Sequence, residues 1–228
     1  MRNSIGMRIV LGLALIAGSI TVWAKDPTLA DAQKEVAAAG KAFDHFVADP
    51  DMDWFRSHAK EAKGIMICSQ IVKAGFIIGG SGGRCVLVVK DPHGWNGPAF
   101  YTMATASAGF QAGIQSSEIA ALIMTQKAID SFMSNSFKAG GDASIAVGPV
   151  GVGTAATPNA DMIFYSRSKG VYGGLDLSGA VIKPTEEYNK AYYGKEVSPI
   201  DIIVRGEVHN PTAKAALTAR VNKLFAAK

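Results

Sequence analysis

The feature that most constrains the fold is residues 71–83, which read IVKAGFIIGGSGG. This stretch is apolar enough for a protein core, but it contains too many glycines for a helix. The next residues, 84–89, are rich in valine and predict a strand. Glycines inside apolar segments are typical of β-structure in which backbones approach closely. We therefore expect short strands near residues 74–78 and 85–89, joined by a glycine turn.

The same stretch contains Gly-Gly-Ser-Gly-Gly at residues 79–83, which fits the G-x-S-x-G pattern of hydrolase nucleophile elbows. An elbow needs a strand, a sharp turn and then a helix, whereas a valine-rich run follows here. His93 lies only twelve residues beyond Ser81, and His209 lies near the end of the chain. The pattern therefore favours a hairpin turn with an incidental serine. A serine hydrolase that uses Ser81 is the alternative.

Residues 1–24 have the features of a signal peptide. Arg2 and Arg8 supply a positive start, and an uncharged, largely apolar run follows over residues 9–24. This run is shorter than the ~20 residues of a membrane-spanning helix, which argues against the alternative of a membrane anchor. We expect cleavage near Ala24 and an exported domain over residues 25–228, periplasmic if the source is a Gram-negative bacterium.

Charge and cysteine content exclude several classes of function. Without Arg2 and Arg8, 21 of the 23 basic residues remain against 19 acidic ones, a net charge of +2 that gives no argument for nucleic acid. Cys68 and Cys85 are either a disulfide closing a short loop or two buried thiols, and they lack the nearby histidines of a metal site. The G-x-G-x-x-A pattern at residues 151–156 is followed by a proline and not by a helix, so no dinucleotide or other cofactor is expected.

The remaining pattern predicts a single α+β domain of mainly antiparallel, glycine-rich strands, sandwich- or barrel-like, with an N-terminal amphipathic helix and short C-terminal helices. Apolar residues recur at helical spacing over residues 29–48, and Thr28 with Asp31 forms a capping box that begins this helix. A basic amphipathic helix over residues 212–228 either docks on the domain or lies on a membrane surface. We expect further helices near residues 54–60, 126–133, 186–193 and 199–204, strands near residues 65–68, 98–117, 143–147, 160–166 and 171–182, and either a strand or a helix at residues 119–124.

Several short motifs follow one another in order between residues 48 and 204. Residues 63–83 read KGIMICSQIVKAGFIIGGSGG, and the later motifs are Trp95 with Pro98-Ala99-Phe100, then residues 109–116 (GFQAGIQS), 148–151 (GPVG), 165–170 (YSRSKG) and 192–194 (YYG). As an ordered set they resemble the SYLF-domain family, also known as the actin-regulator or lipid-binding SYLF domain.

This resemblance implies a non-catalytic phospholipid-binding protein that acts at the surface of a membrane, here the bacterial cell envelope. Actin is not an expected partner of an exported protein. Lys73, within V-K-A-G-F, is the first candidate for a contact to a lipid phosphate, and its alternative is a structural lysine. Charge near the same segment adds the candidates Lys60, Lys63, Arg84 and Lys90. An envelope structural protein that acts through protein–protein contacts is a further alternative.

Overall fold

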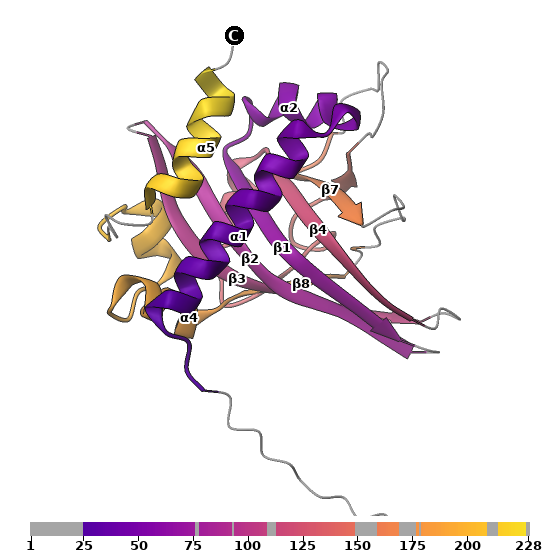
Figure 1. Ribbon diagram of the computed structural model, residues 1–228, viewed down its shortest axis with the longest axis horizontal. Helices are drawn as coiled ribbons and strands as arrows, with labels where there is room; N and C mark the ends of the chain where they lie inside the picture. The colour runs from indigo at the N-terminus through magenta and orange to yellow at the C-terminus, as the bar shows by residue number, and fades with distance from the viewer. Residues whose placement is uncertain are drawn as a thin grey trace, which may run out of the picture.

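The fold is that of a computed structural model, which describes residues 25–75, 78–92, 94–108, 113–148, 159–168, 177, 179–208 and 214–226. Within them an eight-stranded sheet is flanked by helices, so the expected α+β class is confirmed (Figure 1). The predicted signal peptide, the G-x-G-x-x-A loop, His93 and His209 lie outside the described residues.

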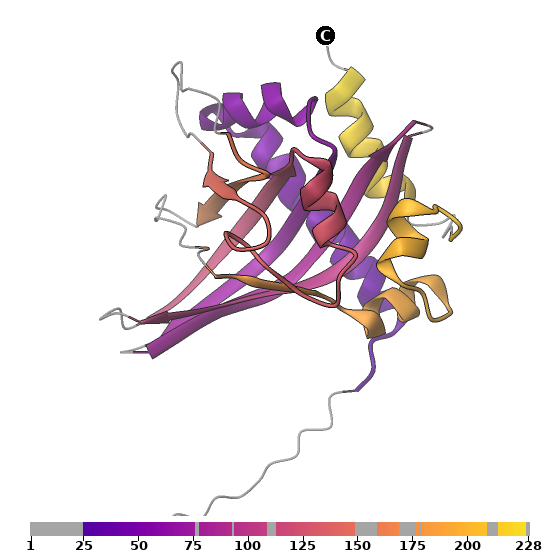
Figure 2. The same ribbon diagram turned by 180° about the vertical axis from the view of Figure 1, so that it is seen from behind.

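The sheet has the strand order β5-β8-β3-β2-β1-β4-β7-β6. Each pair of neighbours is antiparallel except β6 and β7, which are parallel. The four long strands β3, β2, β1 and β4 form its centre, and the sheet curls around its own axis (Figures 1 and 2). The strands are β1 (Gly64–Gly75), β2 (Ile78–Asp91), β3 (Gly94–Ala108), β4 (Gly113–Ile123), β5 (Phe137–Lys138), β6 (Ile145–Val147), β7 (Met162–Ser168) and β8 (Val181–Pro184).

The glycines of residues 79–83 lie inside strand β2, so the prediction of a glycine turn there is wrong. The chain turns between Gly75 and Ile78, and Gly79 already pairs with Gly75. The glycines serve close packing instead. A Cβ on Gly83 would lie 2.0 Å from the carbonyl oxygen of Gln70, at the point where β1 bulges. Glycine is therefore required at position 83 because another backbone occupies the space of a side chain.

Two other strand predictions need correction. Residues 98–117 were expected to form one strand, but they belong to two, β3 and β4, which both border the β1–β2 hairpin. The alternating pattern continued across the connection between them, so it did not reveal the break. The strand expected over residues 171–182 is corrected at its end: β8 begins at Val181, and Ala180 closes a turn by donating a backbone hydrogen bond to Leu177. Residues 171–176 and 178 of this prediction lie outside the described residues. Residues 119–124 were open to a strand or a helix. They form a strand, because β4 extends to Ile123.

Helices cover the sheet, and apolar residues fill both of its faces. Ile65 and Ile67 of β1 pack beneath α1 and α2, whereas Met66 and Cys68 pack on the opposite face with α3. A strand buried on both faces reads as a continuous apolar run, which explains the sequence of β1 and β2. The helices are α1 (Leu29–Ala48), α2 (Asp53–Ala59), α3 (Gln126–Ser131), α4 (Glu186–Tyr193) and α5 (Lys214–Ala226), with a 3₁₀ turn at Pro50–Met52 and a π-helical turn at Ile200–Val204.

Helix α1 packs on the domain, as its pattern predicted. The capping box is present: Thr28 Oγ1 accepts from the Asp31 backbone, and the Asp31 carboxylate accepts from the Thr28 backbone N–H at 2.9 Å. The expected apolar face is buried except for Leu29, which is 46% exposed at the first turn, and Val47, which is partly buried in the last turn. Helix α5 docks beside α1, where Arg220 Nε lies 2.8 Å from Asp44 Oδ2 (Figure 1).

Two polar side chains join segments that are distant in sequence. The carboxylate of Asp161 accepts from the hydroxyl of Thr125, which caps α3, and from the backbone and hydroxyl of Ser144 before β6. These hydrogen bonds lower the pKa of Asp161 to about 2. The side chain of Asn189 on α4 is fully buried. It accepts from the Phe100 N–H at 2.9 Å and donates to the Phe100 carbonyl at 3.3 Å. Asn189 therefore gives both backbone groups of Phe100 on β3 a hydrogen-bond partner.

Candidate functional site

The five basic residues proposed from the sequence do not form one site. Lys63 and Lys90 are neighbours at the end of the sheet near α2, where the Lys90 N–H donates to the Lys63 carbonyl at 2.7 Å, and Lys60 caps α2 just before them. Lys73 lies ten residues along β1 from Lys63, a distance of roughly 30 Å in an extended strand. The structure therefore separates Lys73 from a basic group of Lys60, Lys63 and Lys90.

Arg84, the fifth candidate, is held within the fold. Its Nε lies 3.3 Å from Glu35 Oε2 on α1, and its guanidinium stacks over the ring of Tyr188 on α4, 4.5 Å from the ring centroid. The other carboxylate oxygen of Glu35 accepts from Ser69 Oγ at 2.9 Å, beside the bulge of β1. Arg84 is 45% exposed, so part of it still reaches solvent, but its contacts position α1 and α4 on the sheet.

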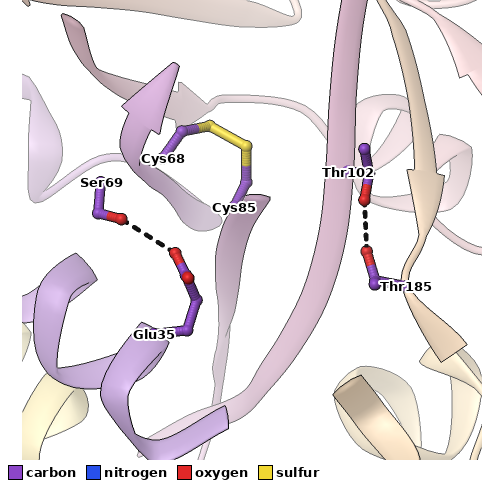
Figure 3. The surroundings of a disulfide bond; sticks show 6 residues. All are labelled: Glu35, Cys68, Ser69, Cys85, Thr102 and Thr185. Atoms are coloured by element: carbon purple, nitrogen blue, oxygen red, sulfur yellow. Dashed lines mark hydrogen bonds between the residues drawn. A yellow bond between two sulfur atoms is a disulfide. The ribbon is translucent and has the colours of Figure 1, made fainter. Parts of the chain in front are cut away.

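A disulfide lies beside this group of contacts. Cys68 of β1 and Cys85 of β2 are joined across neighbouring strands, and both are fully buried in the core on the α3 face (Figure 3). The structure thus selects the disulfide from the two alternatives that the sequence left open. The bond ties the two strands together at the bulge, next to Ser69 and Arg84. The disulfide and the contacts of Glu35 therefore both hold β1 and β2 in place at the bulge.

The four central strands continue beyond the helices as a thin extension of the sheet, which we call the distal arm. It comprises residues 72–75 of β1, 78–82 of β2, 104–108 of β3 and 113–116 of β4 (Figures 1 and 2). None of its side chains that the structure describes is buried. Most residues of the arm are glycine, alanine, serine or threonine, so it consists mainly of paired backbone without a core of its own.

Lys73 lies in a polar row that crosses the distal arm. Its direct partners are Gln115 on β4 and Ser81 on β2, and Ser81 pairs in turn with Thr105 on β3. Directly opposed residues of a sheet project from the same face, so these four side chains lie together. Ser81 Oγ and Thr105 Oγ1 are 2.7 Å apart. The row combines an ammonium group with two hydroxyls and an amide, which are donors suited to phosphate oxygens.

The opposite face of the distal arm is apolar. Val72, Ala74, Ala104, Ala106 and Ile114 lie there, by the alternation of side chains along each strand. Ile114 is 83% exposed, the largest value among the exposed large apolar side chains of the described chain. In the sequence, the alternation of Ile114 with Gln115 indicates one apolar and one polar face, but the small residues and glycines of the other three strands of the arm give no clear periodicity.

Ser81 does not occupy a nucleophile elbow. It lies in the middle of a strand, with its hydroxyl on Thr105 and no helix after it. The two histidines within the described residues have other contacts: His45 Nδ1 lies 2.8 Å from Glu118 Oε1, and His58 stacks on Trp54. The described residues therefore give Ser81 no general base.

A polar network that sequence reasoning missed ties the end of α1 to the sheet. Arg167 of β7 lies 2.9 Å from both Asp49 Oδ2 and Glu118 Oε2, and Glu118 also contacts His45 of α1. Partial burial opposes the charge of Arg167, but hydrogen bonds to the two carboxylates raise its pKa. These residues are up to 118 positions apart, so no spacing in the sequence could indicate the network. Within the described part of the chain, no three histidine, cysteine, aspartate or glutamate side chains form a cluster suited to a metal ion.

Several of the motifs that resemble the SYLF family contribute residues to the core, whereas residues 72–75, 78–82 and 113–116 of the motifs lie in the distal arm. Trp95, Phe100 and Tyr165 are buried, and the Tyr193 hydroxyl donates to the Pro98 carbonyl at 2.8 Å. Gly148 packs so closely on the ring of Tyr165 that a Cβ would lie 2.1 Å from it. The motif residues thus preserve contacts between strands that are far apart in the sequence.

Comparison with known proteins agrees with this pattern. Residues 104–224 match the model of the Ysc84 family, described as Las17-binding protein actin regulator. The chain belongs to this SYLF-domain family. The match covers more than half of its length and includes β4, β7, α4 and α5, so the family assigned from the sequence is confirmed.

Curated relatives share this domain within longer proteins. The chain is 33% identical over 162 residues to LAS seventeen-binding protein 3 of Saccharomyces cerevisiae, covering 68% of this chain and 35% of the yeast protein. It is 31% identical over 149 residues to SH3 domain-containing YSC84-like protein 1 of Pongo abelii, covering 63% of this chain and 43% of the relative. It therefore spans less than half the length of these relatives. No solved structure matches the chain.

Proposed function

We propose that this SYLF-domain protein is a non-catalytic phospholipid-binding protein that acts at the surface of a membrane in the bacterial cell envelope. The observation that carries the proposal is the row Gln115–Lys73–Ser81–Thr105 on the exposed distal arm. A lipid headgroup offers a phosphodiester, and charge-assisted hydrogen bonds from an ammonium group to phosphate are among the stronger polar contacts. Membership of the SYLF family supports this reading.

The contact is peripheral in this proposal. Among the described residues, no helix is long and apolar enough to cross a bilayer. The apolar face that carries Ile114 and Val72 lies on the other side of the same thin arm, where both residues are exposed. In this proposal the face of the arm with the polar row meets the membrane, so Lys73 lies at the level of the lipid headgroups.

Export from the cytoplasm is part of the proposal. Residues 1–24 have the composition of a signal peptide, and the chain's two cysteines form a disulfide. Disulfides persist in oxidising compartments such as the periplasm. The test is to lyse cells in the presence of a thiol-alkylating reagent. We expect neither cysteine to be alkylated, because both are in the disulfide. Alkylation of both cysteines would contradict export.

Co-sedimentation with liposomes tests lipid binding. The full sequence is expressed, and the protein that the cells produce from it is purified. It is mixed at low salt with vesicles of pure phosphatidylcholine or with vesicles that contain both phosphatidylcholine and phosphatidylglycerol. A lysine near an anionic surface contributes about 1 kcal/mol, so Lys73→Gln should lower the partition coefficient about fivefold. Lys41→Gln, an equal change of charge on the exposed side of α1, is the matched control and should have little effect.

The second basic group gives the decisive comparison. Lys60, Lys63 and Lys90 lie roughly 30 Å from Lys73, measured along β1, so one flat membrane does not have to contact both ends of the sheet. If Lys63→Gln with Lys90→Gln abolishes sedimentation and Lys73→Gln does not, the membrane contact is at the α2 end. Failure to bind vesicles of either composition at low salt would refute the function.

A further inference from the structure

The outer edge of strand β3 carries backbone groups that have no partner strand in the described chain. Phe100 directs its carbonyl to the Thr185 N–H and its N–H to Asn189, so both of its backbone groups point away from β2. In an antiparallel ladder this direction alternates from residue to residue, and the β2–β3 register is unbroken over residues 99–108. The N–H and carbonyl groups of Ala106 and Ala108 therefore also point outward.

Strand β8 covers this edge only as far as Ala104, which pairs with Val181. The chain just before β8 turns away from β3. The Gly179 N–H donates to the Ala139 carbonyl, and the Ala139 N–H donates to the Ala180 carbonyl. Among the described residues, nothing therefore continues the sheet past Ala104 on this side.

The exposed edge also lacks the features that normally prevent strand pairing. Residues 105–108 read Thr-Ala-Ser-Ala, with no charged residue and no proline. Soluble proteins usually protect such an edge with lysine, proline or a bulge, because an open edge is a template for another strand. Lys73 is the one charged residue among the arm's described positions.

We propose that the β3 edge of the distal arm pairs with the same edge of a second copy of this chain. The strands run antiparallel about a two-fold axis at Ser107. Ala106 of each copy then lies opposite Ala108 of the other, so all four outward backbone groups of each copy are satisfied, in four hydrogen bonds. The two arms form one continuous sheet of eight strands, and the antiparallel arrangement keeps the two bodies at opposite ends.

A second copy fits this edge better than the other candidate occupants. In the hydrocarbon of a bilayer, the outward N–H and carbonyl groups of Ala106 and Ala108 would stay unsatisfied, at a cost of several kcal/mol each. An unrelated peptide would find no charge or pocket by which the edge could select it. An identical edge needs neither, because a two-fold axis makes the pattern of donors and acceptors self-complementary.

Cysteine cross-linking tests the register. Both native cysteines form the internal disulfide, so an introduced cysteine is the one free thiol. Ser107→Cys places two thiols across the axis at a non-hydrogen-bonded pair, with Cα atoms about 4.5 Å apart, within the range of a disulfide. We expect a covalent dimer on a non-reducing gel after mild oxidation. Ser116→Cys, on the opposite edge of the arm, is the control and should give no covalent dimer on the same gel, because the paired β3 edges keep its two thiols apart.

Sedimentation velocity over a series of concentrations tests the hydrogen bonds. Ala106→Pro removes a donor that points away from β2, so the ladder within the chain is kept and the strand tolerates proline at its edge. The symmetry removes two hydrogen bonds from the dimer, which should raise its dissociation constant at least about tenfold. Ala106→Thr keeps the N–H and should still dimerise. Circular dichroism confirms that each variant is folded.

The outcomes separate this proposal from lipid binding. A wild-type chain that is monomeric at every concentration, or cross-linking of Ser116→Cys without Ser107→Cys, overturns the β3 pairing. A monomer whose binding to vesicles is lost in Ala106→Pro would mean that the edge contacts lipid instead. Dimerisation without any binding to vesicles would retain this inference and refute the proposed function.

Discussion

Replacement of Gly83 by alanine should destabilise the protein more than replacement of any other glycine in residues 79–83. The added Cβ would lie 2.0 Å from the carbonyl oxygen of Gln70 and 2.9 Å from Cδ1 of Ile71. A side chain tip can rotate away, but the carbonyl belongs to the β1 bulge. That bulge is held by the Cys68–Cys85 disulfide on one side and by the Ser69–Glu35 hydrogen bond on the other.

The geometry sets the size of the effect. Real Cβ atoms essentially never approach a neighbour closer than 3.0 Å, so β1 and β2 must separate by about 1 Å at this point. Overpacking of a well-ordered interior costs about 1–3 kcal/mol, and a clash with fixed backbone belongs at the upper end. In a domain of this size, about 3 kcal/mol lowers the melting temperature by roughly 6–12 °C.

Gly80 and Gly82 provide matched controls on the same strand. Their added Cβ atoms would lie 3.2 Å from the Thr105 oxygen and 3.3 Å from the Met103 oxygen, contacts that a shift of a few tenths of an ångström relieves. Alanine there also restricts the unfolded chain, a gain of about 0.4–1 kcal/mol. Thermal and urea unfolding, followed by circular dichroism under non-reducing conditions, should place Gly80→Ala and Gly82→Ala close to wild type. If Gly83→Ala is as stable as either control, the close approach of β1 and β2 at the bulge is wrong.

Two further predictions concern buried polar contacts. Because the pKa of Asp161 is lowered from 3.8 to about 2 in the fold, its stabilisation of about 2 kcal/mol is complete above pH ~4 and is lost as the pH falls through about 2. Asp161→Asn should therefore lower the free energy of unfolding at pH 7 but narrow its difference from wild type in urea titrations at pH 2–3; a constant difference would contradict this. Asn189→Leu should cost about 1–3 kcal/mol, because it leaves the Phe100 N–H buried without its acceptor, and hydrogen exchange at that amide should accelerate. Unchanged exchange at Phe100 would show that another acceptor replaces Asn189.

Local patterns predicted the helices better than the strands. The capping box at Thr28 begins α1 where the sequence indicated. Helix α3 begins at Gln126, after its cap Thr125, and α4 ends at Tyr193, before Gly194 with its positive φ of 72°, in agreement with the expected ranges that begin at 126 and end at 193. These signals are local because a helix satisfies its own hydrogen bonds within one turn. Strands satisfy theirs with distant segments, so the end of one strand depends on its neighbour. That dependence explains why residues 98–117 were taken for one strand.

The candidate site followed the same division. Lys73 was identified through a motif, and the structure adds its partners Gln115, Ser81 and Thr105, which come from three other positions in the chain. The five basic candidates are close in sequence but lie at separate places in the structure, because an extended strand carries residues ten positions apart to opposite ends of the sheet. The contacts of Arg84 with Glu35 and Tyr188 were equally invisible, since they join three elements.

The sequence by itself determined the family, the α+β class and the apolar, glycine-rich character of residues 71–83, because motifs, helix signals and composition are properties of the chain. Only the tertiary structure decided what those glycines do. They are not a turn but part of a long strand that begins in an arm without a core and then passes close to a bulge at Gln70. The physical reason is that glycine permits both sharp turns and close packing, and only the neighbouring strand determines which of the two a given position requires.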